Sequence, residues 1–92
     1  MEDIFKDLSD CLNTIINLLK DFDLTKDDYK KPGIRANQIK MLSIAKIIGN
    51  KVLSDMEKLN SDIDEYLSNP EETIFKKLIH DAVNLQNDLW EL

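Results

Sequence analysis

The chain has 92 residues and a net charge of -6, and 42% of its residues are hydrophobic and 33% charged. This composition indicates one globular domain, 1–92, and excludes a disordered chain. Phosphate backbones and anionic lipids repel an acidic chain, so we expect neither direct nucleic-acid binding nor membrane binding. The single cysteine, Cys11, cannot form an internal disulfide, and no apolar run is long enough to span a membrane, which favours a cytoplasmic protein. The frequent Lys, Asn and Ile suggest an AT-rich bacterial or phage genome.

Residues 2–23 repeat apolar side chains at steps of three and four, which is the spacing of one helix face. Glu2 and Asp3 lie in the first turn, where acidic side chains suit the positive end of a helix. The face consists of Ile4, Leu8, Cys11, Ile15, Leu18 and Phe22. The pattern predicts a first helix, and Pro32-Gly33 ends the connection that follows it.

Residues 34–68 carry an apolar stripe that stays in phase along its whole length, and it therefore predicts a long second helix. The members of the stripe are Ile34, Gln38, Ala45, Val52, Met56, Leu59, Ile63 and Tyr66. Gly49-Asn50 is the weak point, because glycine inside a helix costs about 1 kcal/mol relative to alanine. A break near Gly49 would instead give a four-helix bundle.

The tetrapeptide Asn69-Pro70-Glu71-Glu72 predicts the start of a third helix over residues 70–90. Asn69 can cap the helix, Pro70 fits its first position, and the two glutamates suit its positive end. Its inner face consists of Ile74, Phe75, Leu78, Ala82, Leu85 and Leu89. We therefore predict an all-α fold, an antiparallel three-helix bundle with a long central helix.

The predicted helices differ in length, and this difference predicts a partner. At ~1.5 Å per residue the central helix measures ~50 Å and its neighbours ~33 Å each. Each end of its apolar stripe then lacks one neighbour. An uncovered apolar stripe needs a partner, and a second copy about a two-fold axis is the first candidate. We therefore expect a homodimer, with a foreign protein in the groove as the other solution.

The charge of the predicted central helix changes sign along its length. Residues 29–54 hold six basic residues and no acid, whereas residues 55–72 hold seven acids against Lys58 alone. One explanation is that the acidic first helix lies beside the basic half, while Lys76 and Lys77 lie beside the acidic half. The other is an antiparallel dimer in which the basic and acidic halves of two central helices meet. The two explanations are compatible.

Several side chains off the core stripes are candidates for partner binding. Isoleucines lie off the central stripe, and three apolar residues, one of them a tryptophan, share an outer face of the third helix. Tryptophan is prominent at interface hot spots. An acidic cluster could also dock a basic partner. The plainer interpretations are a wide core face, a solvated acidic face and, for Ile39, a singly exposed residue. The predicted partner-binding residues are Ile44, Ile47, Ile79, Val83, Trp90, Asp62 and Glu65.

We expect no catalytic, cofactor or metal site. His80 is the only histidine, and a zinc site needs about four ligands, usually Cys or His. The acids near the turn at residue 69 have a spacing that fits neither a calcium loop nor a carboxylate-bridged metal bundle. The sequence contains no glycine-rich phosphate loop and no nucleophile with a matching base and acid. We therefore expect a protein that is not an enzyme.

The first functional hypothesis is a protein–protein interaction module, namely an adaptor, inhibitor or immunity-type protein acting through its helical surfaces. The alternative is an acidic inhibitor or regulatory subunit of a nucleic-acid enzyme, encoded by a phage. A third and less favoured hypothesis is a small enzyme whose site forms at a dimer interface.

Overall fold

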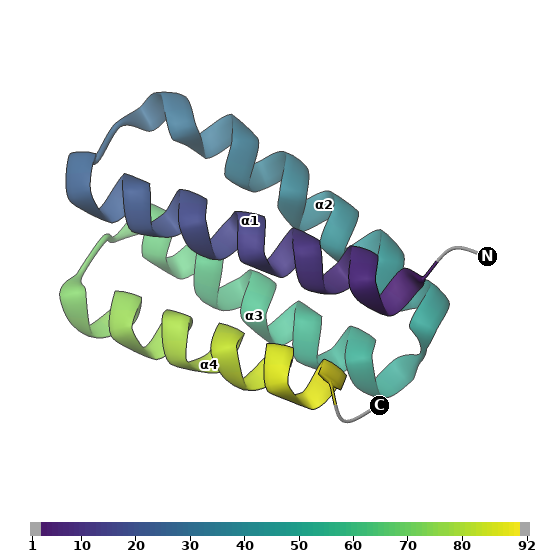
Figure 1. Ribbon diagram of the computed structural model, residues 1–92. Coiled ribbons are helices and arrows are strands. Elements are labelled where there is room, and N and C mark those ends of the chain that lie inside the picture. The colour runs from purple at the N-terminus through teal and green to yellow at the C-terminus, as the bar shows by residue number, and fades with distance from the viewer. Residues whose placement is uncertain (1–2, 91–92) are drawn as a thin grey trace.

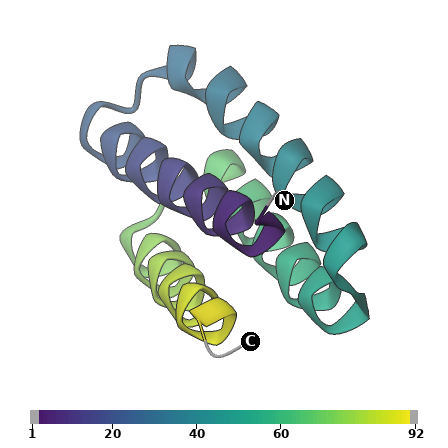
Figure 2. The ribbon, with the colours of Figure 1, turned by 45° about the vertical axis from the view of Figure 1, so that its right-hand side comes forward.

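The computed structural model describes residues 3–90 and, of Trp90, the backbone alone. Its elements are α1 (Ile4–Thr25), a 3-10 turn η1 (Asp28–Lys30), α2 (Lys31–Ile48), α3 (Asn50–Ser68) and α4 (Glu72–Trp90). Successive helices run in opposite directions, as Figure 1 shows, and Figure 2 shows the same bundle from a second direction. The predicted all-α fold is confirmed. None of the helices in the described range is both long and apolar enough to cross a membrane.

The predicted continuous helix over residues 34–68 is wrong, because the chain reverses at Gly49. This one residue separates α2 from α3, with φ 147° and ψ 172°, a conformation almost confined to glycine. Its N–H donates to the Ala45 carbonyl at 3.1 Å, and its carbonyl accepts from the Leu53 N–H at 3.0 Å. Gly49 therefore ends one helix and starts the next. The fold is a four-helix bundle, the alternative expected for a break near Gly49.

The predicted ends of the first helix, the end at Ser68 and the start of the last helix lie within two residues of the observed positions. The start of the second helix is wrong by three residues, because α2 begins at Lys31 and Pro32-Gly33, predicted to end the connection, lie in its first turn. Asp3 caps α1, its carboxylate accepting from the Lys6 N–H at 3.1 Å. α1 is followed by Lys26, which has a left-handed backbone with φ 53°. Asn69, predicted to cap the third helix, is instead the residue that follows α3, and α4 begins at Glu72. Local capping signals thus located the turns but not the first residue of each helix.

The four helices close on one another. Each packs on the helices before and after it in the chain, and α1 also packs on α4, so that α1 and α3, like α2 and α4, lie diagonally across the core. All four contribute fully buried side chains: Leu8, Leu12, Ile15, Ile34, Met41, Leu59, Ile63, Tyr66 and Leu78. The apolar stripes of α2 and α3 are thus covered within one chain. This closure removes the uncovered stripe ends on which the expectation of a homodimer depended.

The packing of α2 on α3 brings the basic and acidic segments together inside one chain. The Arg35 guanidinium pairs with the Asp64 carboxylate. Gln38, which is only 4% exposed, donates to Asn60 Oδ1 at 2.7 Å and to Asp64 Oδ1 at 3.1 Å. α1 lies beside the basic helix α2, and α4 beside the acidic helix α3. The change of charge along the sequence is therefore accommodated without a second copy.

Candidate functional site

The outward side of α2 carries an apolar stripe that is separate from the core. Ala36, Ile39, Ser43 and Ile47 follow one another at steps of three and four residues, so they lie along one side of the helix. All four are exposed, Ile39 by 69% and Ile47 by 71%. We call these four residues the outer α2 stripe. Its two large apolar members, Ile39 and Ile47, lie about two turns apart on this side, and exposed apolar surface of this kind is a candidate for contact with another molecule.

The core holds the outer α2 stripe in a fixed orientation. Ile34, Met41 and Ala45, on the opposite side of α2, are fully buried. Ser43 fits an apolar stripe because its hydroxyl is used within the helix, where Oγ donates to the Ile39 carbonyl at 3.0 Å. The stripe is therefore a preformed surface, and presenting it requires no rearrangement of the bundle.

Positive charge borders the outer α2 stripe on both sides. Lys46 lies on the same side of α2 as Arg35, which pairs with Asp64 on α3. Lys40 lies on the other side, close enough to α1 for its charge to oppose the rise in the pKa of the Cys11 thiol that burial causes. Both lysines are exposed. Neither forms an ion pair with a side chain that the structure describes. Because α2 contains no acidic residue, every charged side chain that α2 itself places beside the stripe is basic.

The predicted partner-binding residues do not form one surface. Ile47 is exposed on α2, whereas Val83, 42% exposed, lies on α4, diagonally across the bundle. Ile44 and Ile79 are half-buried and pack against the core. The side chain of Trp90 lies outside the described residues. The apolar candidates on α2 and those on α4 would therefore contact different parts of a partner.

Sequence reasoning missed two members of the outer α2 stripe, Ala36 and Ser43, and treated Ile39 as an isolated residue. The signal was present in the spacing, since these three and Ile47 repeat at three and four residues on the side opposite the core stripe. It was overlooked because alanine and serine do not stand out as binding residues when each is considered alone.

The two acidic candidates, Asp62 and Glu65, have different surroundings. Glu65 is exposed on α3, whereas Asp62 faces Asp81 on α4. Burial, and then a shared hydrogen bond with Asp81, raise the pKa of Asp62, and the positive charge of Lys77 opposes them. One oxygen of each carboxyl group, Oδ2, is buried without a hydrogen-bond partner among the described residues. Asp62 is therefore part of the contact between two helices and is not a free surface acid.

A buried tyrosine links α3 to the end of α1. The Tyr66 hydroxyl donates to Asp23 Oδ1 at 2.6 Å, and Lys26 Nζ donates to the same oxygen at 2.9 Å. The bond from Tyr66, and then that from Lys26, lower the pKa of Asp23, while burial raises the pKa of Tyr66. The Tyr66 ring packs against Phe22 and Phe75. These contacts give the cluster a structural role at the end of the bundle.

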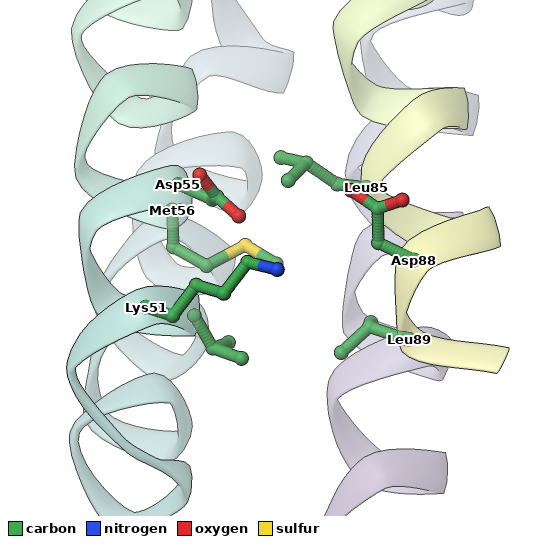
Figure 3. A pocket seen from close by; sticks show the side chains of 7 residues that line it. Lys51, Asp55, Met56, Leu85, Asp88 and Leu89 are labelled. Atoms are coloured by element: carbon green, nitrogen blue, oxygen red, sulfur yellow. The ribbon is translucent and has the colours of Figure 1, made fainter. Parts of the chain in front are cut away.

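Two hollows lie between helices of the bundle. One, of ≈ 230 Å³, lies between the start of α3 and the end of α4, as Figure 3 shows, and is lined by Lys51, Val52, Asp55, Met56, Leu85, Asp88 and Leu89. The other, of ≈ 460 Å³, lies between the start of α1 and the end of α4 and is lined by Asp3, Phe5, Lys6, Ser9, Asp10, Asn13 and Leu89. Neither lining contains a histidine or a thiol, and the charged groups of both are aspartates and lysines.

Chemically reactive side chains elsewhere in the described residues have local, structural partners. His80 is exposed, with Nε2 at 3.2 Å from Asn84 Nδ2. The Cys11 thiol is buried and donates to the Asn37 carbonyl at 3.2 Å, and burial raises its pKa. Between residues 3 and 90, no group of three or more His, Cys, Asp or Glu side chains is placed to hold a metal ion.

No protein-family model, no curated protein and no solved structure matches this chain. The surfaces of the molecule are therefore what indicates its function, and the outer α2 stripe is an apolar surface that the fold itself does not use.

Proposed function

We propose that the protein is a non-enzymatic protein–protein interaction module and that the outer α2 stripe is its docking surface. The observation that carries this proposal is the exposure of Ile39 and Ile47 on one side of a helix whose other side is buried. Covering apolar surface is favourable by about 25 cal/mol per Å². Because the bundle leaves this stripe uncovered, only a second molecule can supply that free energy.

The non-catalytic part of the proposal is supported by the surroundings of the two most reactive side chains. His80 is solvated and has an amide as its neighbour rather than an orienting acid. A buried thiol with a raised pKa, as in Cys11, is a poor nucleophile. We also propose a cytoplasmic location, since a lone buried cysteine is typical of a reducing compartment.

An adaptor or inhibitor fits these features better than the other hypotheses. An acidic inhibitor of a nucleic-acid enzyme would dock through carboxylates, whereas the outer α2 stripe is bordered by Lys40 and Lys46. A homodimer no longer follows from an uncovered core. If two copies associate, the outer α2 stripe is the surface that we expect them to use.

Photo-crosslinking in cells that naturally produce the chain tests the proposal. A benzophenone amino acid in place of Ile47 should give a discrete crosslinked product, and the same group in place of Val83, across the bundle, should not. Adding Ile39→Asp to the first variant should remove the product, because the charge disrupts the stripe without touching the crosslinker. Equal products at both positions, or none at Ile47, would contradict the proposal.

A further inference from the structure

The outer α2 stripe has a shape and a charged border that define the chemistry of its partner, given that it is the docking surface proposed above. We propose that it binds an amphipathic helix whose apolar side is bordered by acidic side chains. Three properties of the stripe support this assignment: its alternation of small and large residues, its unpaired basic border, and its poor fit to a second copy of itself.

The alternation of side-chain size favours a helix as the bound element. Ala36 and Ser43 are the small members of the stripe, and Ile39 and Ile47 are the large ones. Small residues between large ones leave depressions at helical spacing, into which the side chains of a second helix fit. The stripe is ~17 Å long from end to end. A bound helix would therefore find contacts along about three turns.

The charged border favours acidic flanks on that helix. Arg35 is already paired with Asp64, but Lys40 and Lys46 are unpaired with any described side chain and lie on opposite sides of the stripe. An acid on each edge of the bound helix would lie beside one of these lysines. Exposed ion pairs contribute little affinity individually, but the sign of the charge on both edges selects between partners.

The same border disfavours a second copy of this chain. In a two-fold antiparallel pairing of α2 with itself, each edge of the interface holds the same residue from both copies. Lys40 would share one edge with Lys40 of the other copy, and Lys46 would share the other edge with its own counterpart. Like charges brought together at an interface oppose association. An acidic helix from a different protein has no such conflict.

An anionic membrane also combines negative charge with an apolar phase, but it fits less well. A bilayer is an extended anionic surface, so it repels the whole of a protein whose net charge is -6, whereas a single bound helix places its charges beside the stripe alone. The stripe would insert only two large side chains, Ile39 and Ile47. Membrane-bound helices depend on a wider apolar face, commonly with aromatic residues.

Two matched synthetic peptides test the proposal with the intact protein. Each is a helix of about 18 residues with the same apolar stripe, and the positions on both edges of that stripe are Glu in one peptide and Lys in the other. By fluorescence anisotropy in about 0.15 M salt, where screening over ~8 Å limits the effect to charges close to the bound peptide, the Glu peptide should bind about tenfold more tightly than the Lys peptide. The difference should largely disappear in about 1 M salt, where exposed charges are screened.

Variants of the protein locate the effect. The double substitution Lys40→Glu and Lys46→Glu should reverse the preference between the peptides, whereas Lys20→Glu, at an exposed position on α1, should preserve it. Ile39→Asp should abolish binding of both peptides, and Val83→Asp should not. Circular dichroism of each variant confirms that it is folded.

Several results would overturn the inference: equal affinities for the two peptides, a preference that survives the double substitution, or binding that is insensitive to Ile39→Asp. A dimer seen by light scattering that Ile39→Asp dissociates would assign the stripe to a second copy. Binding to vesicles containing phosphatidylserine that is lost in the same variant would assign it to a membrane. If crosslinking through Ile47 succeeds but the peptides are not distinguished, the docking function stands and the acidic helix is wrong.

Discussion

Alanine in place of Gly49 should destabilise the bundle, because Gly49 alone connects α2 to α3. Its φ of 147° and ψ of 172° lie where residues with a Cβ are strained. A Cβ at this position would meet no other atom within 4 Å, so the effect comes from the backbone and not from a clash. We expect the free energy of unfolding to fall by about 1–3 kcal/mol.

The other glycine of the chain, Gly33, provides a matched control. It lies inside α2, and a Cβ there would be 3.7 Å from Leu18 Cδ1, an ordinary contact. Gly33→Ala should raise the free energy of unfolding by about 0.5–1 kcal/mol, because alanine loses less backbone entropy in a helix than glycine. The two substitutions add the same methyl group, so their opposite signs isolate the backbone conformation as the cause.

Urea denaturation followed by far-UV circular dichroism measures both effects. The two variants should differ by about 1.5–4 kcal/mol, with the natural chain between them. Gly49→Ala should also form a dimer that increases with concentration, because a helical residue 49 joins α2 and α3 and lets two chains exchange halves. Equal stability of Gly49→Ala and the natural chain, or a gain in stability, would refute the reasoning.

Three further substitutions test other contacts. Asp62→Asn should raise the free energy of unfolding at pH 7 by on the order of 1 kcal/mol, because the fold raises the pKa of Asp62 and so opposes its ionisation. The gain should vanish well below about pH 4, where the carboxyl is protonated in both the folded and the unfolded state. Urea denaturation at pH 7 and in that acidic range measures the gain, and a gain of equal size under both conditions would contradict the prediction. Tyr66→Phe should lower the free energy of unfolding by about 1–2 kcal/mol, because Asp23 loses the 2.6 Å hydrogen bond from the Tyr66 hydroxyl. That hydrogen bond lowers the pKa of Asp23, so the loss of stability should shrink as the pH falls through the lowered pKa and the carboxylate is protonated. A loss of stability that does not depend on pH would refute the assigned bond between Tyr66 and Asp23. Ile39→Asp should change the free energy of unfolding by less than about 0.5 kcal/mol, and a larger loss in thermal unfolding would place Ile39 in the fold rather than in a binding surface.

The sides of the helices that face the core were predictable from the sequence, but the reversal at Gly49 was not. Met56 and Tyr66 were assigned to the inward stripe from spacing alone, and both are buried. A connection of one residue leaves the three-and-four spacing unbroken on both sides of it. A straight helix and a tight hairpin therefore have the same spacing of apolar residues in the sequence. What favours the hairpin is the burial gained when all four helices close, which is a tertiary quantity that local spacing does not contain.

The candidate site was predictable only where it depended on one helix. Ile47 could be placed on an exposed side because its position follows from the spacing of α2 alone. Ile44 and Ile79 lie at the edges of their core faces, and whether an edge residue is covered depends on where the neighbouring helix lies. The contact of Asp62 with Asp81 depends on how α4 is aligned along α3. That alignment is set by the turn and by core packing, and not by either helix alone.

The change of charge along the sequence can be accommodated in two ways, and Gly49 selects between them. In the hairpin, Arg35 meets Asp64 of its own chain. In a straightened, exchanged dimer, Arg35 would meet the same residue of the other copy. Because these contacts are equivalent, the choice depends on the backbone conformation of residue 49 and on the entropy of bringing two chains together. Glycine makes the reversed backbone accessible without strain, so only the entropic term remains, and it favours the single chain. The outer α2 stripe lies on a side of α2 that neither arrangement covers, so it is available to a partner in both.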